Sequence, residues 1–135
     1  MSTTAAMIKA HPNPTEDLKV NHLAEAIDAC LACVQTCTSC ADACLGEDSV
    51  SDLRDCIRTD LDCADICVTT ATVLSRRTGS NIEVVKELLT ACRKACIACA
   101  EDCESHADHH EHCKICAEAC RRCEKACTDL LGVIG

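Results

Sequence analysis

The chain has 135 residues, the usual size of one domain, and a formal net charge of -9. This acidity argues against nucleic acid and anionic membranes as partners, because both attract lysine and arginine. The sequence contains 17 cysteines but no phenylalanine, tyrosine or tryptophan, so neither an aromatic core nor stacking on bases is available.

The N-terminal residues 1–14, with Pro12 and Pro14, are expected to form a flexible tail before a single domain of residues 15–135. They contain neither the apolar run nor the cleavage pattern of a signal peptide, and no stretch approaches the ~20 apolar residues of a membrane span. A cytoplasmic location is therefore expected, where thiols stay reduced. Many reduced thiols in one cytosolic chain indicate metal or redox chemistry.

Helical patterns fill the first half of the predicted domain. The first segment begins near residues 15–16 and ends before Gly46, which suits a position just after a helix. The second begins at Ser49 or Ser51, both good caps, and ends before Gly79. Neither segment shows the alternation of a strand.

The second half contains two further segments that open with capping-box patterns. Ser80 and Glu83 mark the start of the third segment, and Asp108 and Glu111 mark the start of the fourth, which runs to about Leu131. Short turns between segments place neighbouring helices antiparallel. The sequence therefore predicts an all-α fold, an up-down-up-down antiparallel four-helix bundle with a cysteine-lined core.

The cysteines repeat along each segment in steps of 3, 4 or 7 residues, which is the spacing of a helical core seam. They are Cys30, Cys33, Cys37, Cys40 and Cys44 in the first segment; Cys56, Cys63 and Cys67 in the second; Cys92, Cys96, Cys99 and Cys103 in the third; and Cys113, Cys116, Cys120, Cys123 and Cys127 in the fourth. We therefore expect thiols to fill the middle of the core.

The seams continue beyond the thiols with different residues at the two ends of the bundle. At one end they predict a hydrophobic plug, made of Leu23, Ala26, Thr70, Leu74, Ile82, Val85, Leu89, Leu130 and Ile134. At the other end they predict a polar mouth, where Cys44, Cys56 and Cys113 meet Asp60, His106, His110 and His112. Neutral histidines and a carboxylate at the mouth could capture an incoming ion and pass it to the thiolates, although Asp60 could also be an acid without metal contact.

Residues three or four apart on one helix face have Cβ atoms roughly 5–6 Å apart, so two cysteines at this spacing can hold one metal ion between their thiolates. Soft thiolates favour Cu(I), Zn(II) and iron–sulfur clusters. A zinc ion needs about four thiolates and leaves a charge of -2 on each site, which is costly when buried. Cu(I) accepts two thiolates, and a thiolate can bridge two coppers, so about one Cu(I) per cysteine leaves the core neutral. We therefore expect many Cu(I) ions per chain, with loading that depends on pH.

Four other interpretations of the thiols remain open. The protein could be a sink for zinc or cadmium, or a redox protein that uses iron–sulfur or thiol/disulfide chemistry, although neither proline follows a cysteine as in many cluster motifs. The thiols could serve only as small apolar side chains, but leucine would bury more surface. Disulfides between positions i and i+3 or i+4 fit the required geometry poorly.

The cysteine seams on all four helices, together with the "HADHHEH" mouth (His106, His110, His112), resemble the bacterial copper storage proteins over about residues 20–131. The resemblance is to the cytosolic branch of that family. It implies Cu(I) storage by core thiolates, copper uptake at the histidine end, and assembly into homotetramers. Asp60 replaces a thiol on the second seam, so copper geometry near the mouth is expected to differ from that of members with cysteine at this position.

Leu31, Val34, Ala41 and Leu45 form a second apolar row beside the first cysteine seam, which would suit either a subunit interface or packing within the bundle. Candidate donors and acceptors of the copper are chaperone proteins. There is no Ser/His/Asp arrangement and no phosphate-binding loop, so we do not expect an enzyme.

Overall fold

The computed structural model describes residues 2–79 and 81–134, and in this part of the chain the regular structure is helical. The helices are α1 (Thr3–Ala10), α2 (Asp17–Leu45), the 3-10 helix η1 (Val50–Leu53), α3 (Arg54–Ser75), α4 (Ile82–Glu104) and α5 (Glu111–Ile134).

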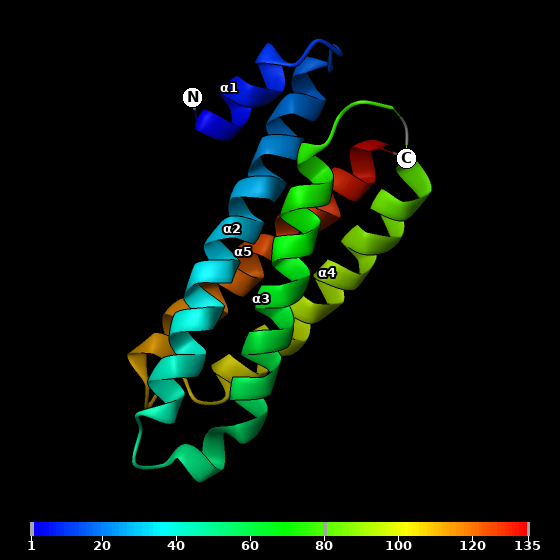
Figure 1. Ribbon diagram of the computed structural model, residues 1–135. Helices are drawn as coiled ribbons and strands as arrows, with labels where there is room; N and C mark the ends of the chain where they lie inside the picture. Colours follow the sequence, from blue (N-terminus) through cyan, green and yellow to red (C-terminus); the bar gives the residue numbers. More distant parts are fainter. Residues whose placement is uncertain (1, 80, 135) are drawn as a thin grey trace.

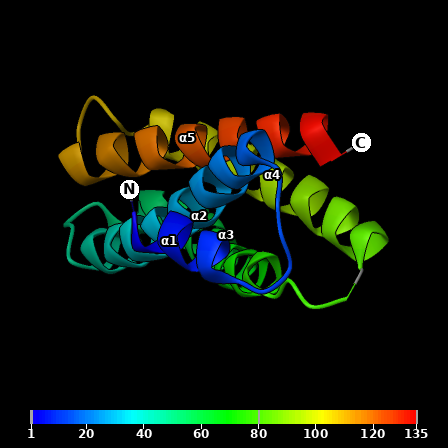
Figure 2. The same ribbon diagram turned by 90° about the horizontal axis from the view of Figure 1, so that it is seen from above.

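The four long helices run antiparallel to their neighbours and form one elongated bundle (Figure 1). Helix α2 packs against α3 and α5, and α4 packs against the same two helices from the opposite corner. Seen from above, α5 lies on one side of the bundle while α2 and α3 lie together on the other (Figure 2). The predicted all-α bundle is therefore confirmed.

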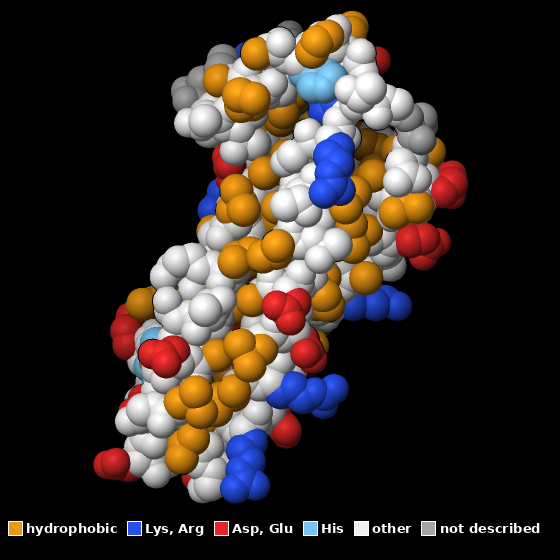
Figure 3. Space-filling model, in the orientation of Figure 1, with side chains coloured by type: hydrophobic (Ala, Val, Ile, Leu, Met, Phe, Trp, Pro, Cys, Tyr) orange, Lys and Arg blue, Asp and Glu red, His pale blue; other side chains and the backbone are white. Residues whose placement is uncertain are grey.

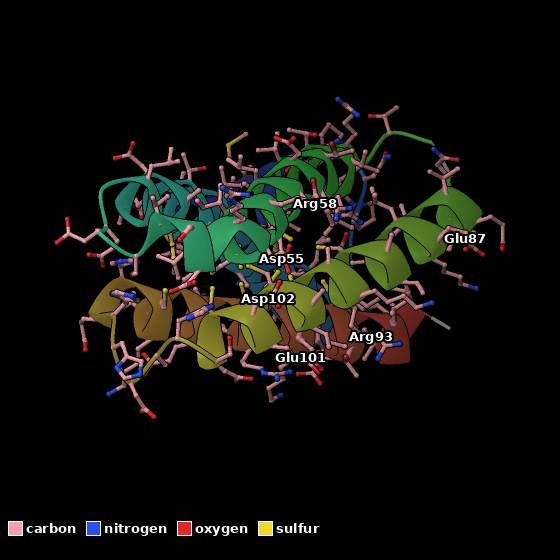
Figure 4. The ribbon with its side chains drawn as sticks, turned by 90° about the horizontal axis from the view of Figure 1, so that it is seen from below. Asp55, Arg58, Glu87, Arg93, Glu101 and Asp102 are labelled. Atoms are coloured by element: carbon pink, nitrogen blue, oxygen red, sulfur yellow. The ribbon has the colours of Figure 1, made fainter. Side chains whose placement is uncertain are left out.

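Along the axis of the bundle, the core changes from cysteine side chains in the middle to a mainly hydrophobic plug at one end, as the sequence predicts. Sulfur atoms lie between the helices (Figure 4), and the cysteines that carry them are buried. Most of the predicted plug residues, namely Leu23, Ala26, Thr70, Leu74, Leu89 and Leu130, are buried beyond the sulfurs. The remaining three, Ile82, Val85 and Ile134, are not fully buried. Together with Leu23, Leu74 and Leu130 they line a hollow of about 490 Å³ on the outer side of the plug. There α4 leans away from α3 (Figure 1).

The N-terminus differs from the expected flexible tail, because Thr3–Ala10 forms helix α1. The Ser2 hydroxyl caps this helix by accepting a hydrogen bond from the Ala5 amide (3.1 Å), and Thr4 bonds Asp28 of α2. An isolated helix of this length is not stable in water. The buried side chain of Ile8, packed in the core cluster, supplies the missing stabilisation.

Two helix starts also differ from the sequence-based expectation. Helix α5 begins at Glu111, so Asp108 lies three residues before it rather than capping it. Helix α4 begins at Ile82 with Asn81 in the cap position, and the predicted cap Ser80 lies outside the described residues. Gly46 follows α2 as expected but keeps a right-handed backbone (φ -87°). Within the described residues, we find no helix whose length and hydropathy would suit a membrane span.

Candidate metal centre

All 17 cysteines are buried and none forms a disulfide. Their sulfurs meet across the core between different helices. Cys30 lies 3.6 Å from Cys123 (α2 to α5), Cys63 lies 3.8 Å from Cys96 (α3 to α4), and Cys56 approaches Cys103 to 3.5 Å. A disulfide bond is only about 2 Å long, so these are contacts between thiols, and they run along the whole middle of the core.

The sulfurs fall into groups whose ligand atoms all lie within 4.8 Å of one another. Four of the groups contain cysteines alone: Cys30, Cys67, Cys92 and Cys123; Cys33, Cys63, Cys67 and Cys96; Cys33, Cys37, Cys63 and Cys120; and Cys37, Cys99, Cys116 and Cys120. Each group shares at least one cysteine with the next. The core is therefore a continuous column of sulfur rather than a set of separate tetrahedral sites.

Within residues 2–79 and 81–134, no buried cationic side chain compensates this column. Among the described residues the buried polar or charged side chains are Asp60 and Thr70 alone. Burial raises the pKa of Cys44 to about 11, and burial together with the nearby Cys56 raises the pKa of Cys113. These two thiols are consequently protonated near neutral pH in the metal-free protein, and a metal ion must displace their protons.

Asp60 lies deeper than the sequence predicted. It was expected at the mouth, but it is fully buried, one helical turn and about 6 Å further into the core than Cys56. One carboxylate oxygen, Oδ1, accepts hydrogen bonds from the thiols of Cys99 (3.0 Å) and Cys116 (3.2 Å). Burial raises the pKa of Asp60 to about 8, against the hydrogen bond from Cys99, which lowers it.

The mouth is built mainly around His112, at the start of α5. Its Nδ1 atom lies 3.4 Å from the Cys40 sulfur and 3.6 Å from the Cys113 sulfur. With Cys44, these residues form a group of possible ligands within 4.8 Å of one another. The structure thus brings His112, Cys44 and Cys113 together as predicted, and it adds Cys40 to the mouth.

The other two predicted histidines lie in the turn before α5, and both are half-buried. The ring of His110 stacks on that of His112, with 5.4 Å between centroids. The backbone carbonyl of His106 accepts hydrogen bonds from the amides of His109 (3.1 Å) and His110 (3.0 Å), which shape this turn.

Sequence reasoning missed Glu47, which follows α2 in the loop at the mouth. Its Oε2 atom accepts hydrogen bonds from His110 Nδ1 (2.7 Å) and His112 Nε2 (2.9 Å). The hydrogen bond from His112 holds the pKa of Glu47 below its ordinary value. The only signal in the sequence was an acidic residue directly after Gly46, and acidic residues are common in surface loops.

Chemically, the arrangement offers many soft ligands in mutual contact, a buried carboxyl group among them, and imidazole ligands at one end. Soft thiolates and imidazoles select copper and zinc over hard cations such as magnesium. Bridging by shared thiolates would let one column hold many ions.

Comparison with known proteins agrees with this chemistry. The sequence profile of the copper storage protein family matches residues 19–132. The copper storage protein Ccsp of Streptomyces lividans, solved with 10 copper equivalents, is 49% identical; the match covers 96% of this chain and 98% of that chain, with a TM-score of 0.93. A structure of the cytosolic copper storage protein of the same organism with five coppers is 52% identical, covering 89% and 100% of the two chains, with a TM-score of 0.87.

A more distant relative shares the fold as well. The Cu(I)-bound form of Csp3 from Bacillus subtilis is 36% identical, covers 78% of this chain and 94% of its own, and superposes with a TM-score of 0.70. Among curated protein sequences, none matches the chain. The profile match spans most of the chain, and the solved relatives share both its fold and a third to a half of its residues. The protein belongs to the copper storage protein family.

Proposed function

We propose that this protein stores and buffers multiple Cu(I) ions in the cytoplasm as a single copper-binding domain of residues 15–135. The cysteine thiolates of the core hold the ions, Asp60 contributes a carboxylate ligand within the column, and His106, His110 and His112 receive copper at the mouth. The chemistry is reversible ligation rather than catalysis. Relatives support the assignment, since one is described as cytosolic and another as Cu(I)-bound.

The observation that favours copper over zinc is the sharing of cysteines between neighbouring groups. Cys33 and Cys63 each belong to two groups, as do Cys37 and Cys120. A thiolate that completes one isolated zinc tetrahedron is not available for the next, whereas a bridging thiolate serves two Cu(I) ions. One Cu(I) per thiolate also keeps the column neutral, and buried zinc tetrathiolates would each leave a charge of -2 without a buried cation to offset it.

An anaerobic titration of the fully reduced protein with Cu(I), against a coloured Cu(I) chelator, tests this function. We expect tight binding of about one copper per thiol, because each sulfur can bridge two ions. Saturation near four ions would instead indicate tetrahedral sites and a zinc sink. A parallel titration with Zn(II) provides the control, and it should saturate at the lower number.

We also propose that the bundles associate as homotetramers and exchange copper with chaperone proteins. Of the apolar row beside the first seam, Leu31 (49% exposed) and Leu45 (61% exposed) face outward, whereas Ala41 is buried and Val34 packs against the core. Hydrophobic side chains form several patches along the face that α2 and α3 make up (Figure 3). Such patches are typical of subunit interfaces.

Light scattering after size-exclusion chromatography tests the tetramer. We expect a mass of four 14.4 kDa chains, and Leu31→Asp should lower it because a charge in an apolar interface is costly. Lys94→Asp, at an exposed site on α4, serves as the charge control. A single-chain mass for the unmodified protein would refute the assembly.

A further inference from the structure

Glu47 joins the loop after α2 to the turn before α5 and to the start of α5 itself, segments that are far apart in the sequence. Its own backbone is tied down, since its amide donates to the Cys44 carbonyl (3.2 Å) and its carbonyl accepts from the Val50 amide (3.2 Å). Its Oε2 atom accepts from His110 Nδ1 at 2.7 Å and from His112 Nε2 at 2.9 Å. One carboxylate oxygen therefore holds both stacked imidazole rings.

These hydrogen bonds decide which nitrogen of each neutral ring carries the proton. A carboxylate accepts only, so the proton of His112 must lie on Nε2 and that of His110 on Nδ1. The Nδ1 atom of His112 is then an unprotonated lone pair, and it is this atom that faces the sulfurs of Cys40 (3.4 Å) and Cys113 (3.6 Å). In the other tautomer an N–H would point at the sulfurs, where it could not bind a metal ion.

We propose that Glu47 is a positioning residue for copper capture, which fixes the tautomers of His110 and His112 and aims Nδ1 of His112 at Cys40 and Cys113. A hydrogen bond from the distal nitrogen of a ligating histidine to a carboxylate commonly sets ring orientation and ligand basicity. The proposal rests on the proposed function in that copper is taken up at this mouth. It adds a residue that does not itself need to touch the ion.

A simpler role for Glu47 would be to attract a cation by its charge alone. Two substitutions separate the two roles. Glu47→Ala removes both the acceptor and the charge, whereas Glu47→Gln removes the charge but keeps a carbonyl oxygen that can accept from an imidazole N–H. Asp48→Ala is the matched control, because Asp48 is the adjacent exposed carboxylate in the same loop.

The first measurement uses the metal-free protein and nitrogen-15 NMR of the imidazoles, at a pH about two units above the ordinary histidine pKa of ~6.5. We expect a single Nε2–H tautomer for His112 and a single Nδ1–H tautomer for His110. In Glu47→Ala each ring should become a mixture of the Nδ1–H and Nε2–H tautomers. In Glu47→Gln at least one of the two rings should keep a single tautomer. Unchanged tautomers in Glu47→Ala would overturn the proposal, whatever happens to copper binding.

The second measurement follows the first phase of Cu(I) uptake by stopped flow, with total capacity recorded on the same samples. We expect Glu47→Ala to slow this phase about 10-fold or more, Glu47→Gln to recover most of the rate, and Asp48→Ala to match the unmodified protein. Adding Glu47→Ala to His112→Ala should cause little further slowing if Glu47 acts through His112. If Glu47→Gln is as slow as Glu47→Ala, charge attraction is the correct explanation and positioning is wrong.

The two proposals fail in different ways. A low capacity of the unmodified protein for Cu(I) would refute storage and would leave the NMR result intact. Full capacity, together with an uptake rate that Glu47→Ala does not change, would refute the role of Glu47 and leave storage standing.

Discussion

Serine at Cys33, Cys37, Cys63 and Cys120 should remove more Cu(I) ions than the four thiols that are lost. These cysteines form one group in the middle of the column, and each is shared with a neighbouring group. Their loss leaves each of the two neighbouring groups with only two of its four cysteines, so the copper ions bridged there are lost as well. The capacity should be measured by anaerobic titration against a chelator.

The comparison for this variant is serine at Cys30, Cys92, Cys123 and Cys127, which lie at the plug end of the column. There the remaining sulfurs stay continuous, so we expect a loss of only about one ion per thiol removed, on the two-coordinate bridging argument. Equal losses in the two variants would argue against a continuous column. Full capacity in the central variant would show that these thiols do not hold the copper.

The bundle should stay folded in both variants. A buried hydroxyl is tolerated in a helix when it bonds the carbonyl four residues earlier, and Thr70 already does so in this core, donating to the Ile66 carbonyl at 2.8 Å. Circular dichroism of the metal-free proteins should therefore show unchanged helix content. An unfolded variant would make its copper capacity uninterpretable, and single serine substitutions would then be titrated one at a time.

Asp60→Asn should remove a large pH dependence from the stability of the metal-free protein. The pKa of Asp60 is raised from 3.8 to about 8, first of all by burial. The folded state therefore holds a proton that the unfolded state releases between those values, so stability falls as pH rises through this range. A shift of this size corresponds to a loss on the order of 5 kcal/mol between pH ~4 and ~8.

Chemical denaturation of reduced, metal-free protein across that pH range measures the effect. We subtract the unfolding free energy of the unmodified protein from that of Asp60→Asn. This difference should grow from near zero at pH ~4 to several kcal/mol near pH ~8. Asp62→Asn is the control on the same helix, since Asp62 is 57% exposed and pairs with Arg58 at the surface. A flat difference for Asp60→Asn would mean that the carboxyl group ionises normally inside the core.

The thiols of Cys44 and Cys113, whose pKa values burial raises, add a second decline at higher pH, with a different origin. An unfolded thiol has a pKa near ~8.5, whereas burial raises that of Cys44 to about 11. Unfolded chains therefore lose thiol protons first, and stability should fall further above pH ~8.5 in both proteins. This decline should persist in Asp60→Asn, which separates the two contributions.

The sequence by itself determined the bundle and the chemistry of its core. Steps of 3 and 4 residues place every cysteine on the inner face of a helix whatever the loops do, because the period of an α-helix is fixed. Short connections then force antiparallel neighbours. The plug and the mouth followed from the same periodicity, continued past Cys92, Cys103 and Cys127.

Features that depend on contacts between residues distant in the sequence could not be predicted from it, and only the tertiary structure shows them. Helix α1 is too short to be stable alone, and its packing on the bundle maintains it, with Ile8 buried in the core cluster and Thr4 bonded to Asp28. The depth of Asp60 depends on the axial stagger of α3 against α4 and α5, and no local pattern records that stagger. Glu47 reaches His110 and His112 because the loop after α2 and the start of α5 meet at the same end of the bundle, although Glu47 and His112 are 65 residues apart.

The sharing of thiols between groups is likewise a tertiary property. Heptad spacing shows that sulfurs face the core, but it does not show which sulfurs of four helices come within reach of one ion. That depends on the relative heights of the helices, which the close packing of all the buried side chains sets. Periodicity therefore predicted which residues line the column, and packing decided how they combine.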